Sequence, residues 1–173
     1  LGLVLGLLYS TGAAAEDEAR VAVLDVIGDM PDTVLSVVTD QVRAGALNAL
    51  PTDAYNVMTQ ESMRALLEEM GVDPDECARA ANCEVDYGQR IGAALVVSGK
   101  VAEVDGTKML TLKLFDAKKA KMLSTTMVKA KGAEALIDKT SPEATEMIRE
   151  GLGLPPPTRQ GPRASEGKLG GRS

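Results

Sequence analysis

The sequence predicts an α/β domain whose mixed sheet begins with parallel strands and ends as an antiparallel meander. Two observations support this prediction. Residues 20–71 alternate between strand and helix patterns, which is typical of parallel strands joined by right-handed crossovers. Residues 95–128 contain three strand patterns separated by short polar turns, which is typical of hairpins. In a chain of 173 residues, a single α/β domain over residues 16–154 accommodates both halves.

The parallel half consists of two strand–helix pairs. Residues 20–27 form a nearly continuous β-branched run, as expected of a strand buried on both faces. Apolar side chains then recur every three or four residues across 32–50, which predicts an amphipathic helix. A second strand at 55–58 leads into a second helix, with Thr59 as its N-cap and Gly71 as its stop.

The antiparallel half follows from alternation and turn residues. Residues 95–104 form the first predicted strand, and Asp105-Gly106 is a preferred dipeptide for a tight hairpin turn. Residues 109–115 place three leucines on one face and polar residues on the other, which predicts a sheet with one solvated face. A third strand is predicted at 122–128.

The carboxyl-terminal part is predicted to contain helix followed by a tail. Residues 132–139 are expected to form one or two helical turns. A separate helix is then predicted to begin at the capping box 140–143, which has the sequence Thr-Ser-Pro-Glu, and to end at Gly151 and Gly153. Residues 155–173 are dominated by Pro, Gly, Ser, Arg and Lys, a composition that predicts disorder.

Composition excludes several functional classes. The sequence contains no histidine, which excludes Ser-His-Asp and Cys-His catalysis, histidine-ligated zinc and a histidine pH switch. The net charge is −6, and residues 16–94 carry 16 acids against 5 bases, a balance of −11. Nucleic-acid binding depends on basic patches and aromatic stacking, and aromatic residues make up only 2% of this chain. Nucleic acid is therefore not an expected partner.

The first residues have the pattern of an export signal. Residues 1–8 are apolar and are followed by Ala13-Ala14-Ala15, so residues 1–15 are interpreted as a signal-peptide remnant with cleavage before Glu16. The apolar run is shorter than the about 20 residues that a spanning helix needs. We therefore expect a periplasmic or secreted protein without membrane insertion.

Cys77 and Cys83 are the only cysteines, and in an exported protein they are predicted to form a disulfide bond. On one continuous helix, residues six apart are separated by about 9 Å, beyond the roughly 7 Å limit for bridging. The helix is therefore expected to break near Asn82. Five intervening residues do not fit a redox-active C-x-x-C motif, and zinc would lack further Cys or His ligands.

Two other parts of the sequence contain residue types that occur in binding or catalytic sites. Ser98-Gly99-Lys100 fails as a phosphate loop because the glycine spacing is wrong and Val101 follows the lysine. Asp25 is expected inside the first strand, where it is either a functional carboxylate at a strand end or a partner of a nearby helix N-terminus. We predict no catalytic residue, no cofactor and no metal ligand.

Three motifs resemble a family of envelope proteins. They are the strand at residues 21–26, the strand–helix junction at 55–63, and the run from Gly88 to Gly99. Together they resemble the domain shared by the amino-terminal part of TolB, the periplasmic propeller protein of the Tol system, and curli-secretion-channel (CsgG)-like lipoproteins. In that family a strand runs through Val-Met-Thr-Arg/Gln-Glu into a helix, and Ile-Gly-Ala-x-x-Val-Val-Ser-Gly enters the hairpins. The resemblance extends over residues 20–130.

The resemblance implies a fold of the anticodon-binding-domain type and a non-enzymatic, exported protein. It also implies an envelope protein partner, in a role such as envelope assembly or transport. Two alternatives remain open from the residues. One is a small-ligand or glycan-binding domain, and the other is a hydrolase that uses carboxylates such as Asp25.

Overall fold

The structure is a computed structural model that describes residues 18–72 and 83–156. Its sheet has six strands: β1 (Ala19–Val23), β2 (Ile27–Gly28), β3 (Tyr55–Val57), β4 (Leu95–Val104), β5 (Thr107–Asp116) and β6 (Lys121–Ala130). The described helices are α1 (Asp32–Ala49), α2 (Gln60–Glu69), α4 (Cys83–Arg90) and α5 (Ala133–Leu152).

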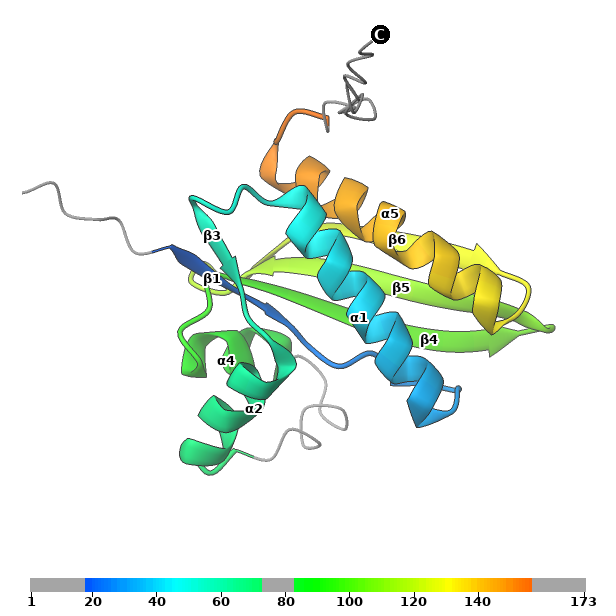
Figure 1. Cartoon of the computed structure of the whole chain (residues 1–173), viewed down its shortest axis with the longest axis horizontal. Helices are drawn as coiled ribbons and strands as arrows, with labels where there is room; N and C mark the ends of the chain where they lie inside the picture. The colour runs from blue at the N-terminus through cyan, green and yellow to red at the C-terminus, as the bar shows by residue number, and fades with distance from the viewer. Residues whose placement is uncertain (1–17, 73–82, 157–173) are drawn as a thin grey trace, which may run out of the picture.

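The sheet is mixed, as the sequence predicts. Its strand order is β3-β1-β4-β5-β6, and β2 pairs separately with β4 (Figure 1). β1 runs parallel to both β3 and β4, whereas β4, β5 and β6 form an antiparallel meander. The change from parallel to antiparallel pairing therefore takes place at β4, where the sequence pattern also changes.

Two hydrophobic clusters lie on opposite faces of the sheet. α1 and α5 lie side by side on one face, and their apolar side chains pack against β1, β4, β5 and β6. α2 and α4 gather at the β1 end of the sheet and pack against the other face (Figure 1). Alternation along the strands produces this division, because Val21 and Val23 belong to the first cluster and Ala22 to the second.

Several local predictions are confirmed. α1 and α2 occupy the predicted helical segments, and Thr59 caps α2 by accepting a hydrogen bond from the backbone N–H of Ser62 at 3.1 Å. Asp105 and Gly106 have φ values of 49° and 73°. Positive φ at both central residues is what a type I′ hairpin turn requires, and it explains the preference for Asp-Gly.

The first strand is not continuous over residues 20–27 as predicted. It ends at Val23, and β2 begins only at Ile27, where the chain pairs with Lys100 further along β4. In between, the backbone N–H of Val26 donates to Thr39 Oγ1 at 2.9 Å instead of to a strand. The buried threonine on α1 thus provides the hydrogen bond that the sheet does not.

The prediction of a separate helix beginning at Thr140 is wrong. α5 is continuous, and Pro142 lies inside it. Thr140 is fully buried and donates back to the carbonyl oxygen of Leu136 at 2.7 Å, so it does not act as an N-cap. An interior proline costs about 3 kcal/mol. Burial of one stripe along the whole helix offsets that cost: Leu136, Thr140, Ala144, Met147 and Ile148.

Some predictions concern residues outside the described ranges. These are the signal peptide at 1–15, most of the tail at 155–173, and Cys77 with the expected helix break near Asn82. The domain boundaries therefore stay predictions. Within residues 18–72 and 83–156, no helix combines the length and apolar composition needed to cross a bilayer.

Candidate functional site

Asp25 lies after β1, at the carboxyl end of the parallel strands. It is exposed and lies outside β1, so the prediction that places Asp25 inside the first strand is wrong. Its carboxylate accepts a hydrogen bond from Gln60 Nε2 at 2.9 Å, and Gln60 is the first residue of α2. Of the two interpretations of Asp25, the structure thus favours contact with the start of a helix. That contact is made through a side chain, because Thr59 occupies the cap position.

The first turn of α2 fixes the charge of Glu61. Its own backbone N–H lowers the pKa of this carboxyl below the ordinary value of 4.5, and a hydrogen bond with the side chain of Thr59 lowers it further. Both groups stabilise the ionised form of the carboxyl, which is the usual effect of a helix N-terminus on an acidic side chain. Glu61 is therefore ionised at neutral pH, and its lowered pKa makes it a weaker base than an ordinary glutamate.

We expect Thr59→Ala to raise the pKa of Glu61 toward its ordinary value without fully restoring it, because the larger backbone contribution remains. An NMR titration of the glutamate carboxyl carbons would measure the change, with Thr59→Ser as the control that keeps the hydroxyl. Since the pKa is lower in the folded state, the contribution of Glu61 to stability is present above its unfolded pKa and is lost as the pH falls through its folded pKa. Equal pKa values in wild type and Thr59→Ala would contradict the assigned contact.

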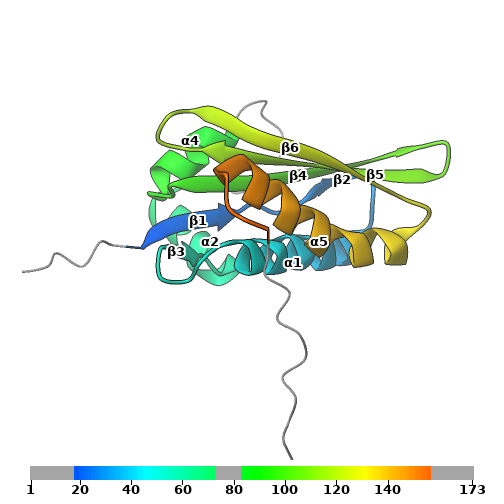
Figure 2. The ribbon, with the colours of Figure 1, turned by 90° about the horizontal axis from the view of Figure 1, so that it is seen from above.

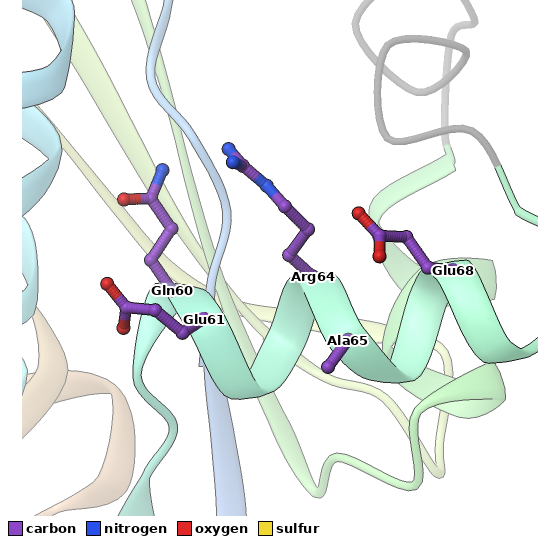
Figure 3. Close-up of a pocket in the computed structure, with 5 residues that line it drawn as sticks. All are labelled: Gln60, Glu61, Arg64, Ala65 and Glu68. Carbon is purple, nitrogen blue, oxygen red and sulfur yellow. The ribbon is translucent and has the colours of Figure 1, made fainter.

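A shallow, open hollow of about 200 Å³ lies along the outer surface of α2. Figure 3 shows Arg64 projecting between Gln60 and Glu68 on the same side of the helix. The lining residues are Gln60, Glu61, Arg64, Ala65 and Glu68. These side chains offer hydrogen-bond donors and acceptors of both charges, and Asp25 is not among them. The arrangement suits recognition of a polar surface better than a two-carboxylate reaction, for which facing acids must flank the substrate.

The polar face of α2 was not among the sites predicted from the sequence. The sequence indicates this polar face only through the spacing of its residues. Met63 and Leu67 turn inward and are buried, and Gln60, Arg64 and Glu68 follow one another at intervals of four. That spacing places the three polar side chains along one side of the helix. Nothing in such a spacing distinguishes a binding surface from a solvated face.

The Ser98-Gly99-Lys100 segment has a structural explanation. A Cβ placed on Gly99 would lie 2.9 Å from Val26 Cγ2 and 3.1 Å from Leu112 Cδ2, so the glycine permits close packing inside the sheet. Ser98 Oγ donates to Glu84 Oε1 at 3.4 Å. Among the described residues, no group of three or more acids or cysteines is arranged to hold a metal ion.

Cys83 begins the described part of α4 and is not a free thiol. Its predicted partner, Cys77, lies outside the described residues, so the Cys77–Cys83 disulfide stays a prediction. Cys83 is partly buried and packs against the cluster formed by α2, α4 and β4. A bond there would tie the chain before α4 to the second hydrophobic cluster.

Comparisons with known proteins identify the fold. No protein-family model matches the chain, and no curated protein does. The LpoB carboxyl-terminal domain from Salmonella enterica has a similar structure, with a TM-score of 0.50 and 9% identity over 66% of this chain and 83% of that one. TolB from Acinetobacter baumannii has a TM-score of 0.51 and 12% identity over 82% of this chain, which spans only 30% of the TolB chain.

At these identities the similarity shows a shared fold and not a shared activity. The α/β fold that the motifs predict is therefore confirmed, and the similarity to TolB agrees with one part of the resemblance. The curli-channel part of the resemblance stays a prediction.

Proposed function

We propose that this chain is a non-enzymatic protein-interaction domain of the cell envelope, located in the periplasm or secreted. The observation that supports it most is the fold shared with TolB. In this chain, the strand–helix junction at residues 57–61 and the run at 91–99 are also the motifs that resemble the envelope family. The export-like pattern of residues 1–15 points to the same compartment.

The shape of the hollow on α2 favours a protein partner over a small ligand at that place. Small-molecule sites are usually concave and enclose about 300–1,000 Å³. The hollow on α2 is smaller and open, and a single helix lines it. Its charged side chains can form hydrogen bonds and ion pairs across a protein interface without enclosing a ligand. This argument also makes a glycan site the weaker alternative.

Location is the first test of the proposed function. Osmotic-shock fractionation of the native host, followed by immunodetection of the chain, is expected to place it in the periplasmic or envelope fraction or in the culture medium. A cytoplasmic marker and a periplasmic marker provide the controls. Recovery of the chain with the cytoplasmic marker would reject the proposal.

A second test asks whether the chain binds a nucleotide or a divalent metal. Thermal unfolding of the purified chain is expected to be unchanged by a panel of nucleotides and divalent metals, because a ligand that binds only the native state raises the unfolding temperature. Stabilisation by several degrees with any one of them would contradict a purely protein-binding role.

A further inference from the structure

The face of the β4–β6 meander opposite α5 carries a separate set of side chains. Leu110, Leu112 and Leu114 of β5 are fully buried on the α1–α5 side. Alternation therefore directs Met109, Thr111 and Lys113 to the other side of β5. The register continues this face onto both neighbouring strands. Its further members are Lys100 on β4 and Thr125, Met127 and Lys129 on β6.

We call these seven residues the lysine face. Lys100 and Lys129 are exposed, Lys113 is half-buried, and Met127 is 51% exposed. α4 contacts β4 at Ser98, whose hydroxyl donates to Glu84. In Figure 2, α1 and α5 lie along one side of the meander, while α4 lies on the other side near one end of the strands.

The charged members of this face are all lysines, and a described acid, Glu84 of α4, reaches its β4 edge at Ser98, the register partner of Lys113. Lys113 is two residues along β5 from Thr111, the register partner of Lys100, so the two lysines are diagonal neighbours roughly 7–8 Å apart. Lys129 pairs with Met109 on the same face. None of the seven residues is acidic, and none of the three lysines forms an ion pair with a described residue. Other lysines do so: Lys108 pairs with Glu103 and Lys119 with Asp116.

These lysines belong to the part of the chain that follows its acidic half, since residues 16–94 carry the balance of −11. Three cations on adjacent strands, without an acidic partner among residues 18–72 and 83–156, repel one another, and that repulsion is relieved when an anionic surface approaches. Met109 and Met127 lie between the lysines and offer flexible apolar contact, which is common at binding surfaces. The face contains no aromatic side chain on which nucleic-acid bases could stack.

We propose that the lysine face binds a partner protein through a surface that combines acidic and apolar side chains. The inference rests on the proposed interaction function and adds a defined surface and a partner chemistry to it. It assigns the lysines a role distinct from that of α2, whose exposed face carries Glu61 and Glu68. The charged residues of the lysine face are all basic, whereas those of the α2 face have both signs.

The test uses a short fluorescent peptide in which glutamates alternate with leucines, with anisotropy as the readout. The wild-type chain is expected to bind it, and the triple variant Lys100→Glu, Lys113→Glu, Lys129→Glu is expected to bind at least tenfold more weakly. The matched control reverses three exposed lysines, two in the β5–β6 turn and one at the first residue of β6: Lys118→Glu, Lys119→Glu and Lys121→Glu. It has the same net charge, loses only one exposed ion pair of little energetic value, and is expected to bind within twofold of wild type.

A triple Lys→Gln variant of the lysine face serves as a milder version, and circular dichroism verifies that each variant is folded. Equal loss of binding in the turn control and the face variant would overturn the proposal, because total charge would then explain the effect. Salt-sensitive self-association that the face variant abolishes would identify a second copy of the chain as the occupant and also overturn it. Tighter binding of phosphatidylglycerol vesicles than of the peptide would do the same.

These outcomes are separate from those that test the proposed function. A chain that is found in the envelope fraction but does not bind the peptide would reject the lysine face alone. A cytoplasmic chain that binds the peptide through these lysines would reject the envelope function and keep the surface.

Discussion

Gly45→Val is expected to lower the free energy of unfolding by about 3 kcal/mol, the upper part of the range for overpacking a well-filled core. A Cβ placed on Gly45 would lie 2.6 Å from the Cβ of Ala144 and 2.8 Å from the carbonyl oxygen of Ser141. Both atoms belong to the inner surface of α5 and cannot rotate away. α1 and α5 would have to separate to admit even a methyl group.

Separation of the helices would also break hydrogen bonds that cross the α1–α5 interface. Arg149 Nη1 donates to the carbonyl oxygen of Ala49 at 2.8 Å. The single hydroxyl proton of Thr145 has two acceptors within reach, the carbonyl oxygen of Gly45 across the interface at 3.1 Å and that of Ser141 on its own helix at 2.8 Å. Each such bond contributes about 1 kcal/mol to stability. The steric and hydrogen-bond effects therefore act in the same direction.

Urea unfolding measures this change, and Asn48→Val is the matched control. Asn48 is exposed on the same helix and receives the same side chain, so its substitution is expected to change stability by less than about 0.5 kcal/mol. If the two variants are equally stable, α1 and α5 do not approach each other at Gly45 as closely as the structure places them.

Local signals made much of this fold predictable from the sequence. The alternation of Leu110, Leu112 and Leu114 sets the inner face of β5, and Asp105-Gly106 sets the turn before it. Thr59 supplies an oxygen at the start of α2, where unpaired backbone N–H groups need an acceptor. In each case the cause lies within a few residues of its effect.

The predictions that were wrong depended on partners distant in the sequence. β1 ends early because Thr39 accepts a hydrogen bond from the backbone N–H of Val26. α5 continues through Pro142 because its whole inner stripe is buried against α1 and the sheet. The predicted capping box at 140–143 has the correct local chemistry. The helix nevertheless continues through these residues because its inner side is buried. The extent of that burial depends on the tertiary fold, so a local sequence pattern does not predict it.

The candidate sites were even less predictable. Contact between Asp25 and Gln60 joins residues 35 positions apart, and only the folded chain brings them together. The lysine face is assembled from three strands whose register decides which lysines become neighbours. Single lysines at alternate strand positions are typical of any solvated face, so the sequence alone gives no reason to group Lys100 with Lys129.

The two faces of β5 are expected to respond very differently to truncation. Leu112→Ala should lower the free energy of unfolding by about 2–5 kcal/mol, because it removes a fully buried side chain and leaves a cavity. Leu112 packs where Gly99 leaves room on the neighbouring strand, so few atoms can move in to fill the space. Chemical denaturation of the purified chain measures the loss.

Thr111→Ala, one position earlier on the same strand, is the matched control. Its side chain lies on the lysine face, outside the α1–α5 core, so we expect it to cost less than about 1 kcal/mol, within the range of strand propensity. A large loss at Thr111 would mean that the lysine face is covered in the folded chain, which would remove the basis for a docking surface there. A small loss at Thr111 beside a large loss at Leu112 would show that stability depends on the α1–α5 face of β5, so that the lysines on the opposite face can be changed without unfolding the domain.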